Sequence, residues 1–337
     1  MSDTPATRPS FVFRAGVRIA GTVVTCDGNA ATDLLFLSHA PVMAAHGRRG
    51  LPGLGRGRRQ LLTTDTTLTL LGPVGERLRS HALVTAFGRP FTLGALRLEL
   101  YPSGYLPGAA SLLCEQGGRR LVYAGPLGDQ PDVRAADAVC LDARWAGADL
   151  PLPARAEAEA GLLAAVRGRG AGAAPVLVVD PPGLAPVVGQ VLAQAGVAVR
   201  TNRKILESLA VYRRALGVTP RAATIQRYSG RLAAHELLLW AAGAPVPAQA
   251  GKPVPRPILA VGPRAGQGGG GLVFPMGADA GRLVGYVRAT GAAEAALVGA
   301  PDDHLAGLLR AGGIAAYRLG PPRQMPLFTL SDGGPWG

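Results

Sequence analysis

The pattern of apolar residues changes its period once along this chain, and that change limits the folds available to it. Before about residue 150 the apolar stretches are short and bounded by glycine or asparagine, as in "FVFRAGVRIAG" and "DLLFLS", which predicts strands. After residue 154 helical and strand-like segments alternate, beginning with "ARAEAEAGLLAAVRGRG" and "APVLVVD". Such alternation is typical of α/β layers. The whole pattern predicts an α/β fold, a four-layer αββα sandwich with an inserted α/β domain.

Composition shifts mark the expected boundaries. Residues 1–150 would form the first part of the sandwich, 151–255 the inserted α/β domain, and 256–320 the return segment of the sandwich. Residues 321–337 are rich in Pro and Gly and predict a flexible tail. Within the first part, Gly117-Gly118 predicts a hairpin turn. The stretch "LLTTDTTLTLL" predicts a strand or a strand-turn segment.

Charge is the strongest compositional signal. The chain has 35 Lys and Arg against 22 Asp and Glu, a formal net charge of +13. A codon bias toward arginine explains the choice of Arg over Lys, but it does not explain the excess of positive charge. A net charge of this size favours a polyanionic partner, and nucleic acid is the partner we expect.

Other features bear on the compartment. No apolar run is long enough to span a bilayer, so no membrane contact is expected. The first residues, "MSDTPATRPS", lack the apolar segment of a signal peptide, so the sequence predicts a cytoplasmic protein. Cys26, Cys114 and Cys140 are widely spaced and form no CxxC pair. This spacing predicts reduced core residues and not disulfides or zinc ligands.

Several segments contain parts of metal-binding motifs and appear in a fixed order. They are "LSHAPVMAAH", "YPSGYLPGAASLL", "RRLVYAGPLG", "LVFPMGADAGRL" and "AALVGAPDDHLAGLLRAGGIAAYRLG". The ordered series resembles the metallo-β-lactamase-fold exonucleases associated with bacterial DNA ligases. These are related to RNA 3′-end processing nucleases that carry a β-CASP domain. The resemblance covers about residues 10–320, and it implies a metallo-β-lactamase sandwich with a β-CASP-like insertion.

The resemblance also implies where the ligands of two metal ions would stand. His39 matches the first histidine of the family's His-x-His-x-Asp-His cluster. The other ligand positions hold Pro41, Met43, Ala44, Tyr105, Pro126, Gly277 and Gly299. Of these side chains only a tyrosine phenolate could bind a hard divalent metal. The sequence therefore predicts a pseudo-nuclease without catalytic residues, metal or cofactor.

Two alternatives stay open at this point. His39, His46, Asp65 and His81 could form a rebuilt metal site, which would make the chain an active exonuclease or phosphodiesterase. The chain could also be a protein–protein adaptor whose charge is incidental. Asp142, which follows a predicted strand, is interpreted as a turn or cap residue.

Two clusters of basic residues are candidates for nucleic-acid binding, because guanidinium groups bind phosphate bidentately. A Gly/Arg loop carries Arg48, Arg49, Arg56, Arg58 and Arg59. A strand-to-helix segment carries Arg200, Arg203 and Lys204, followed by Arg213 and Arg214. DNA is the expected partner, with RNA as the alternative.

The tail contains a short motif, "RQMPLFTL". Gln324, Met325, Leu327 and Phe328 resemble the pentapeptide (Gln-Leu-Ser/Asp-Leu-Phe) by which bacterial replication and repair proteins dock on the sliding clamp. The resemblance implies a DNA-repair or replication accessory protein that docks on the clamp. Other repair proteins, such as a DNA ligase or a helicase, are further expected partners.

The tail motif generates a test. Replacing Leu327 and Phe328 by Ala should abolish binding to the sliding clamp, because these two side chains would be the apolar anchors. Titration calorimetry should show affinity on the order of micromolar for the unchanged chain and none for the variant. The melting temperature should barely change. A large fall in melting temperature, with no clamp binding by either form, would make the motif a chance match.

Overall fold

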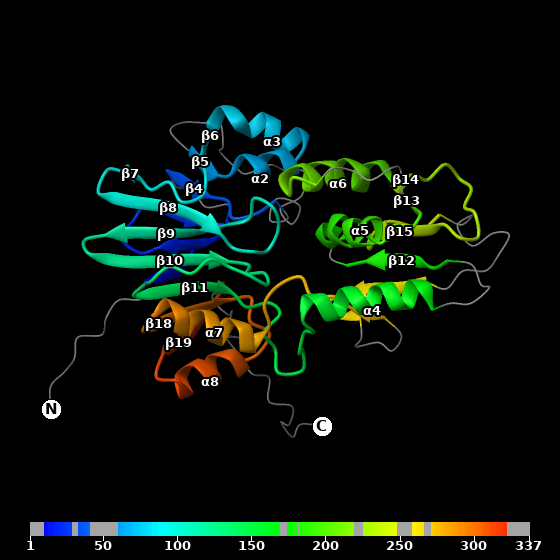
Figure 1. Ribbon diagram of the computed structural model, residues 1–337. Coiled ribbons are helices and arrows are strands. Elements are labelled where there is room, and N and C mark those ends of the chain that lie inside the picture. Colours follow the sequence, from blue (N-terminus) through cyan, green and yellow to red (C-terminus); the bar gives the residue numbers. More distant parts are fainter. Residues whose placement is uncertain are drawn as a thin grey trace, which may run out of the picture.

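The computed structural model describes residues 10–28, 33–40, 60–168, 174–180, 182–218, 225–247, 258–265 and 271–321. In this part the chain is a mixed α/β protein with three β-sheets (Figure 1), which confirms the predicted α/β class. Sheets A and B pack face to face, and sheet C belongs to an α/β unit beside them. No helix in the described ranges is long and apolar enough to cross a membrane.

Sheet A consists of six short strands that follow one another in sequence order. Its strands are β1 (Phe11–Phe13), β2 (Val17–Ile19), β3 (Val24–Cys26), β4 (Leu34–Phe36), β5 (Gln60–Thr63) and β6 (Ala82–Val84). The pairs β1-β2 and β2-β3 are antiparallel, and from β3 onward neighbouring strands are parallel.

Sheet B has seven strands in the order β19-β18-β11-β10-β9-β8-β7. They are β7 (Phe91–Leu93), β8 (Leu96–Pro102), β9 (Ala110–Gln116), β10 (Arg119–Gly125), β11 (Ala138–Asp142), β18 (Glu294–Val298) and β19 (Ala315–Leu319). The predicted hairpin joins β9 to β10, and Gly117 and Gly118 both have positive φ, at 57° and 77°. Only glycine adopts such a pair of angles without steric cost.

The facing surfaces of sheets A and B share one apolar core. Phe36 packs edge-on against Tyr123, with ring centroids 6.1 Å apart. Cys26, Cys114 and Cys140 are free thiols buried in this core, as the sequence predicted. Burial raises the pKa of all three thiols above the ordinary value, so they stay protonated and unreactive at neutral pH.

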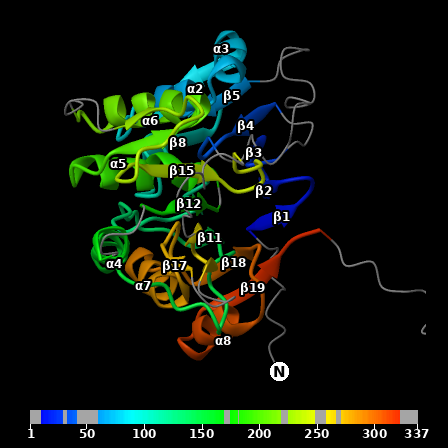
Figure 2. The ribbon, with the colours of Figure 1, turned by 90° about the vertical axis from the view of Figure 1, so that its right-hand side faces the viewer.

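Helices cover both outer faces of the sandwich. α2 (Asp65–Leu70) and α3 (Pro73–Leu78) pack on sheet A. α7 (Ala280–Thr290) and α8 (His304–Ala311) pack on sheet B. The layers therefore run helix, sheet, sheet, helix (Figures 1 and 2).

Of the strand or strand-turn segment predicted over "LLTTDTTLTLL", the first part is a strand and the rest is a helix. β5 ends at Thr63, and α2 follows directly, capped by the Thr64 side chain, which accepts a hydrogen bond from the Thr67 backbone N–H. The hydroxyls of Thr64 and Thr67 also donate to the carbonyl oxygen of Gly108, at 2.7 and 2.9 Å. Threonine thus acts here through its hydroxyl as a helix cap, which outweighs its preference for strands.

Sheet C is entirely parallel, in the order β14-β13-β15-β12-β16-β17. Its strands are β12 (Val176–Val179), β13 (Val199–Thr201), β14 (Ile225–Arg227), β15 (Leu237–Ala241), β16 (Ile258–Gly262) and β17 (Leu272–Val273). One face is covered by α4 (Arg155–Arg167), α5 (Ala185–Gln194) and α6 (Arg203–Ala215). Valine- and leucine-rich runs suit such buried parallel strands.

The α/β unit extends further than the sequence predicted. β16 pairs with β12, and β17 pairs with β16. The unit therefore reaches at least Val273, not residue 255, and the sandwich resumes with α7. A short apolar run does not reveal which sheet it will join, so the pattern alone could not place this boundary.

All six strands of sheet C point the same way, with their carboxyl ends toward the sandwich (Figure 1). α6, which follows β13, contacts α2 of the sandwich. In parallel sheets, ligands bind beyond the carboxyl ends of the strands. The junction between the two parts is therefore the place to look for a functional site.

Candidate functional site

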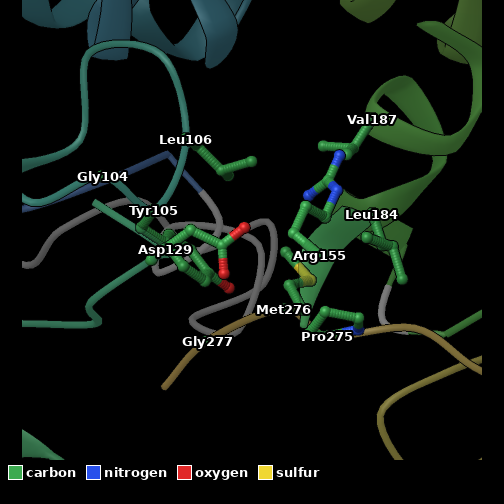
Figure 3. Close-up of a pocket in the computed structure, with 11 residues that line it drawn as sticks. Gly104, Tyr105, Leu106, Asp129, Arg155, Leu184, Val187, Pro275, Met276 and Gly277 are labelled. Carbon is green, nitrogen blue, oxygen red and sulfur yellow. The ribbon is translucent and has the colours of Figure 1, made fainter. Parts of the chain in front are cut away.

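A small cavity lies at this junction (Figure 3). Tyr105 and Leu106 line it from the sandwich, and Leu184, Val187 and Arg155 line it from the α/β unit. Its volume is about 40 Å³, which holds no more than a few water molecules. The cavity is too small for a nucleotide.

The loop between β8 and β9 fills the junction with apolar side chains. Tyr105 and Leu106 pack against the core of the α/β unit. The Tyr105 ring also stands edge-on to His39, with ring centroids 5.2 Å apart. Burial raises the pKa of Tyr105 above the ordinary value, and the nearby carboxylate of Asp142 raises it further. Tyr105 is therefore a neutral phenol at neutral pH.

His39 is held in a buried hydrogen-bonded chain. Its Nδ1 lies 2.8 Å from the Ser38 hydroxyl oxygen, and that hydroxyl donates to Asp27. Tyr123 donates to the same carboxylate at 2.9 Å, and the Ser38 backbone N–H donates at 2.8 Å. Because the hydroxyl has one proton and gives it to Asp27, His39 must carry its proton on Nδ1 and donate.

Burial sets the protonation of this chain. It lowers the pKa of His39 to about 3, with the positive charge of Arg144 as a second cause. It raises the pKa of Asp27 to about 6, against the hydrogen bonds from Ser38 and Tyr123, which favour the carboxylate. At neutral pH, His39 is therefore neutral and Asp27 is ionised.

Asp142 and Arg144 form a two-point ion pair at the carboxyl end of β11. Arg144 Nη2 lies 2.6 Å from Asp142 Oδ2, and Arg144 Nε donates to Oδ1 at 2.9 Å. The Asp142 side chain is only 10% exposed, whereas that of Arg144 is 51% exposed. A buried carboxylate needs a counter-charge, and the Arg144 guanidinium supplies it here.

Trp145, the next residue, fills the space beside Gly277. A Cβ on Gly277 would lie 2.7 Å from Trp145 Cδ1, closer than two carbons pack. The Arg264 guanidinium stacks on the Trp145 ring, 5.3 Å from its centroid. No side chain fits at position 277 unless this stack moves.

The predicted ligand positions that the structure describes converge on the loop Asp142–Trp145. Arg144 lies near His39 and Tyr105, and a Cβ on Gly299 would lie 3.6 Å from Arg144 Cβ. Gly277 contacts Trp145, and Pro126 precedes Leu127, whose carbonyl oxygen also faces Gly277. Pro41, Met43 and Ala44 lie outside the described residues. Positions far apart in the sequence thus meet at one place.

These residues do not fit a two-metal centre. Within the described ranges, no group of three or more His, Cys, Asp and Glu side chains could hold a metal ion. Of the residues considered for a rebuilt site, Asp65 forms an ion pair with Arg79, His81 ends the 3₁₀ turn Arg79–His81, and His46 lies outside the described residues. Asp27 and Asp142, the carboxylates near His39, are bound by protein hydrogen-bond donors and by Arg144.

The predicted nucleic-acid contacts divide into two groups. Arg200 is bound by Glu236 at 2.6 Å, and Arg203 by Glu207 at 2.6 Å. In the described part of the chain, Lys204 forms no ion pair with an acidic side chain. The Gly/Arg loop (Arg48, Arg49, Arg56, Arg58, Arg59) and the tail motif (Gln324, Met325, Leu327, Phe328) lie outside the described residues.

Basic residues that the sequence did not single out join Lys204 at the carboxyl ends of sheet C. Arg227 ends β14 and is paired in register with Thr201 of β13, three residues before Lys204. Arg264 follows β16. We refer to Lys204, Arg227 and Arg264 as the basic edge; all three are exposed. Only the parallel pairing of sheet C brings them to one side, so no local motif could have indicated it.

Sequence reasoning also missed Arg144 and Trp145. The motif "CLDARW" contained the signal, since an aspartate at a strand end followed two residues later by arginine can pair with it. No family model matches the chain, and no curated protein sequence matches it either. The site is therefore defined by its geometry alone.

The Asp142–Arg144 pair generates a stability prediction. Arg144→Gln should destabilise the fold by about 1–3 kcal/mol, because Asp142 loses its counter-charge while staying buried. Adding Asp142→Asn should recover much of that loss. Urea unfolding of both single variants and the double variant gives the coupling energy.

A matched control is Arg203→Gln with Glu207→Gln, a pair with the same 2.6 Å separation but with side chains 77% and 61% exposed. Its coupling should be about 0.5 kcal/mol or less. Equal coupling in the two pairs would contradict a special role for Arg144.

His39 generates a pH prediction. The pKa of His39 is lowered in the folded state. The unfolded chain therefore takes up a proton on His39 below about pH 6.5, whereas the folded chain takes it up only near pH 3. The stability advantage of wild type over His39→Asn should therefore shrink as pH falls from 6.5 toward 4. Asp27 has the opposite effect, since its raised pKa favours folding as pH falls, but it is present in both proteins and cancels. A pH-independent difference would mean that His39 is not buried in its neutral form.

Proposed function

We propose that this chain is a catalytically inactive nuclease-fold protein that binds nucleic acid in DNA repair or replication. Its fold would be a metallo-β-lactamase-type sandwich with a β-CASP-like insertion. Support comes from the order of the layers, from the α/β unit inserted between β11 and α7, and from the convergence of the ligand positions on one loop. Loss of catalysis is supported by Arg144 and Trp145, which occupy the surroundings of those positions.

The basic edge is the observation that carries the binding proposal. Lys204, Arg227 and Arg264 are exposed and, among the described residues, lie beyond ion-pair distance of every Asp and Glu. Phosphate groups could therefore bind them without breaking an internal ion pair. The Arg264 guanidinium is additionally oriented by its stack on Trp145. Backbone contact of this kind is independent of base sequence.

The location of the charge adds support. The described residues contain 24 of the 35 Lys and Arg and 20 of the 22 Asp and Glu. Most of the excess positive charge thus belongs to segments beyond them, including the Gly/Arg loop with Arg56, Arg58 and Arg59. Clamp docking through Leu327 and Phe328 stays a prediction from sequence. The proposed partners are DNA, with RNA as the alternative, and the sliding clamp.

The basic edge generates a binding test. Replacing Lys204 and Arg227 by Ala should weaken DNA binding by a similar factor for all sequences. It should also reduce the slope of log affinity against log salt by up to about 2, because each lost cation removes one phosphate contact. Fluorescence anisotropy at several salt concentrations measures both quantities.

Arg89→Ala with Arg288→Ala is the matched control, since it removes the same charge from exposed positions before β7 and near the end of α7. If both pairs weaken binding equally, net charge and not the basic edge explains it. Elemental analysis of the same preparation should find well under one equivalent of zinc or manganese. Stoichiometric metal with metal-dependent cleavage would instead establish the rebuilt nuclease.

A further inference from the structure

The cavity at the junction has no room for the end of a strand. Its volume of about 40 Å³ is far below the ~300–1,000 Å³ of sites that enclose a small organic ligand. Its walls are also firmly packed, since Leu184 is 1%, Val187 2% and Met276 5% exposed. Enlarging the cavity would expose this apolar surface to water.

The junction is also held together by contacts between its two sides. Tyr105 and Leu106 of the sandwich pack against the apolar core of the α/β unit. Arg264 of the α/β unit stacks on Trp145 of the sandwich, and α2 contacts α6. Opening the junction would break apolar and cation–π contacts together, at a cost of several kcal/mol. An exposed ion pair with phosphate at the rim of the junction would contribute much less free energy than these contacts.

The former reaction centre is buried behind this contact layer. His39 is 2% exposed and lies against the Tyr105 ring. By contrast, the basic edge is exposed at the carboxyl ends of β13, β14 and β16. Lys204 and Arg227 therefore offer phosphate an exposed contact away from the buried His39, and among the described residues the junction cavity is too small to enclose a strand end.

We propose that the protein binds internal stretches of the nucleic-acid backbone along the basic edge and does not recognise strand ends. This inference rests on the proposed function. The ligand would be a continuous sugar–phosphate chain, and its ends would not be needed for binding. An exonuclease must by contrast take a terminus into its active site. Loss of end recognition would turn such a scaffold into one that can bind anywhere along a strand.

The experiment compares a single-stranded DNA minicircle with the linear strand of the same sequence, and uses full-length protein. Competition anisotropy should give affinities that agree within about two-fold, because both present the same phosphates. A linear strand with a bulky group on each end should bind equally well. The Lys204→Ala, Arg227→Ala variant should bind circle and linear strand more weakly by the same factor.

A circle that binds ten-fold or more weakly than the linear strand, or loss of binding on blocking the ends, overturns the inference while leaving the proposed function intact. Absence of binding to circle and linear strand alike contradicts the proposed function itself. The same set made in RNA identifies which sugar the backbone contact prefers. For DNA and RNA alike, equal affinity for circular and linear strands supports the inference, and tighter binding of the linear strand contradicts it.

Discussion

The carboxylate of Asp142 needs a positive charge beside it, and the rest of the junction depends on how that need is met. Its side chain is 10% exposed at the end of a central strand. An ionised carboxylate in such a place is costly unless it is paired. A metal centre would meet the need with ions taken from solution. This chain meets it with Arg144, two residues away and attached to the same loop.

An internal counter-charge removes the demand for other anionic ligands nearby. Side chains at the predicted ligand positions can then pack against their neighbours. Tyr105 is a neutral phenol that lies against His39, and Leu106 packs against the core of the α/β unit. Trp145 takes the space beside Gly277. The sandwich and the α/β unit are therefore joined by packed side chains at the junction.

The sequence predicted the parts of the fold that local chemistry decides. Gly117 and Gly118 can form one kind of tight turn, and the apolar period distinguishes the α4 helix from the β12 strand. It did not predict what depends on contact between distant segments. The Thr64 cap depends on Gly108, 44 residues away. The membership of β16 in sheet C depends on pairing with β12. For the site, the sequence singled out Tyr105, Gly277 and Gly299, but it did not indicate Arg144 and Trp145, which lie against them.

The same distinction applies to charge. Arg200 and Lys204 are four residues apart and looked equivalent as phosphate-binding residues. Arg200 contacts Glu236 through both Nε and Nη2, at 2.8 and 2.6 Å, with both side chains largely buried. A phosphate would have to displace that carboxylate. Lys204 forms no such bond within the described ranges, and its neighbour Arg227 comes from a strand 23 residues later. The number of basic residues in a sequence therefore overstates binding capacity, because only charges left without an internal partner add attraction for a polyanion.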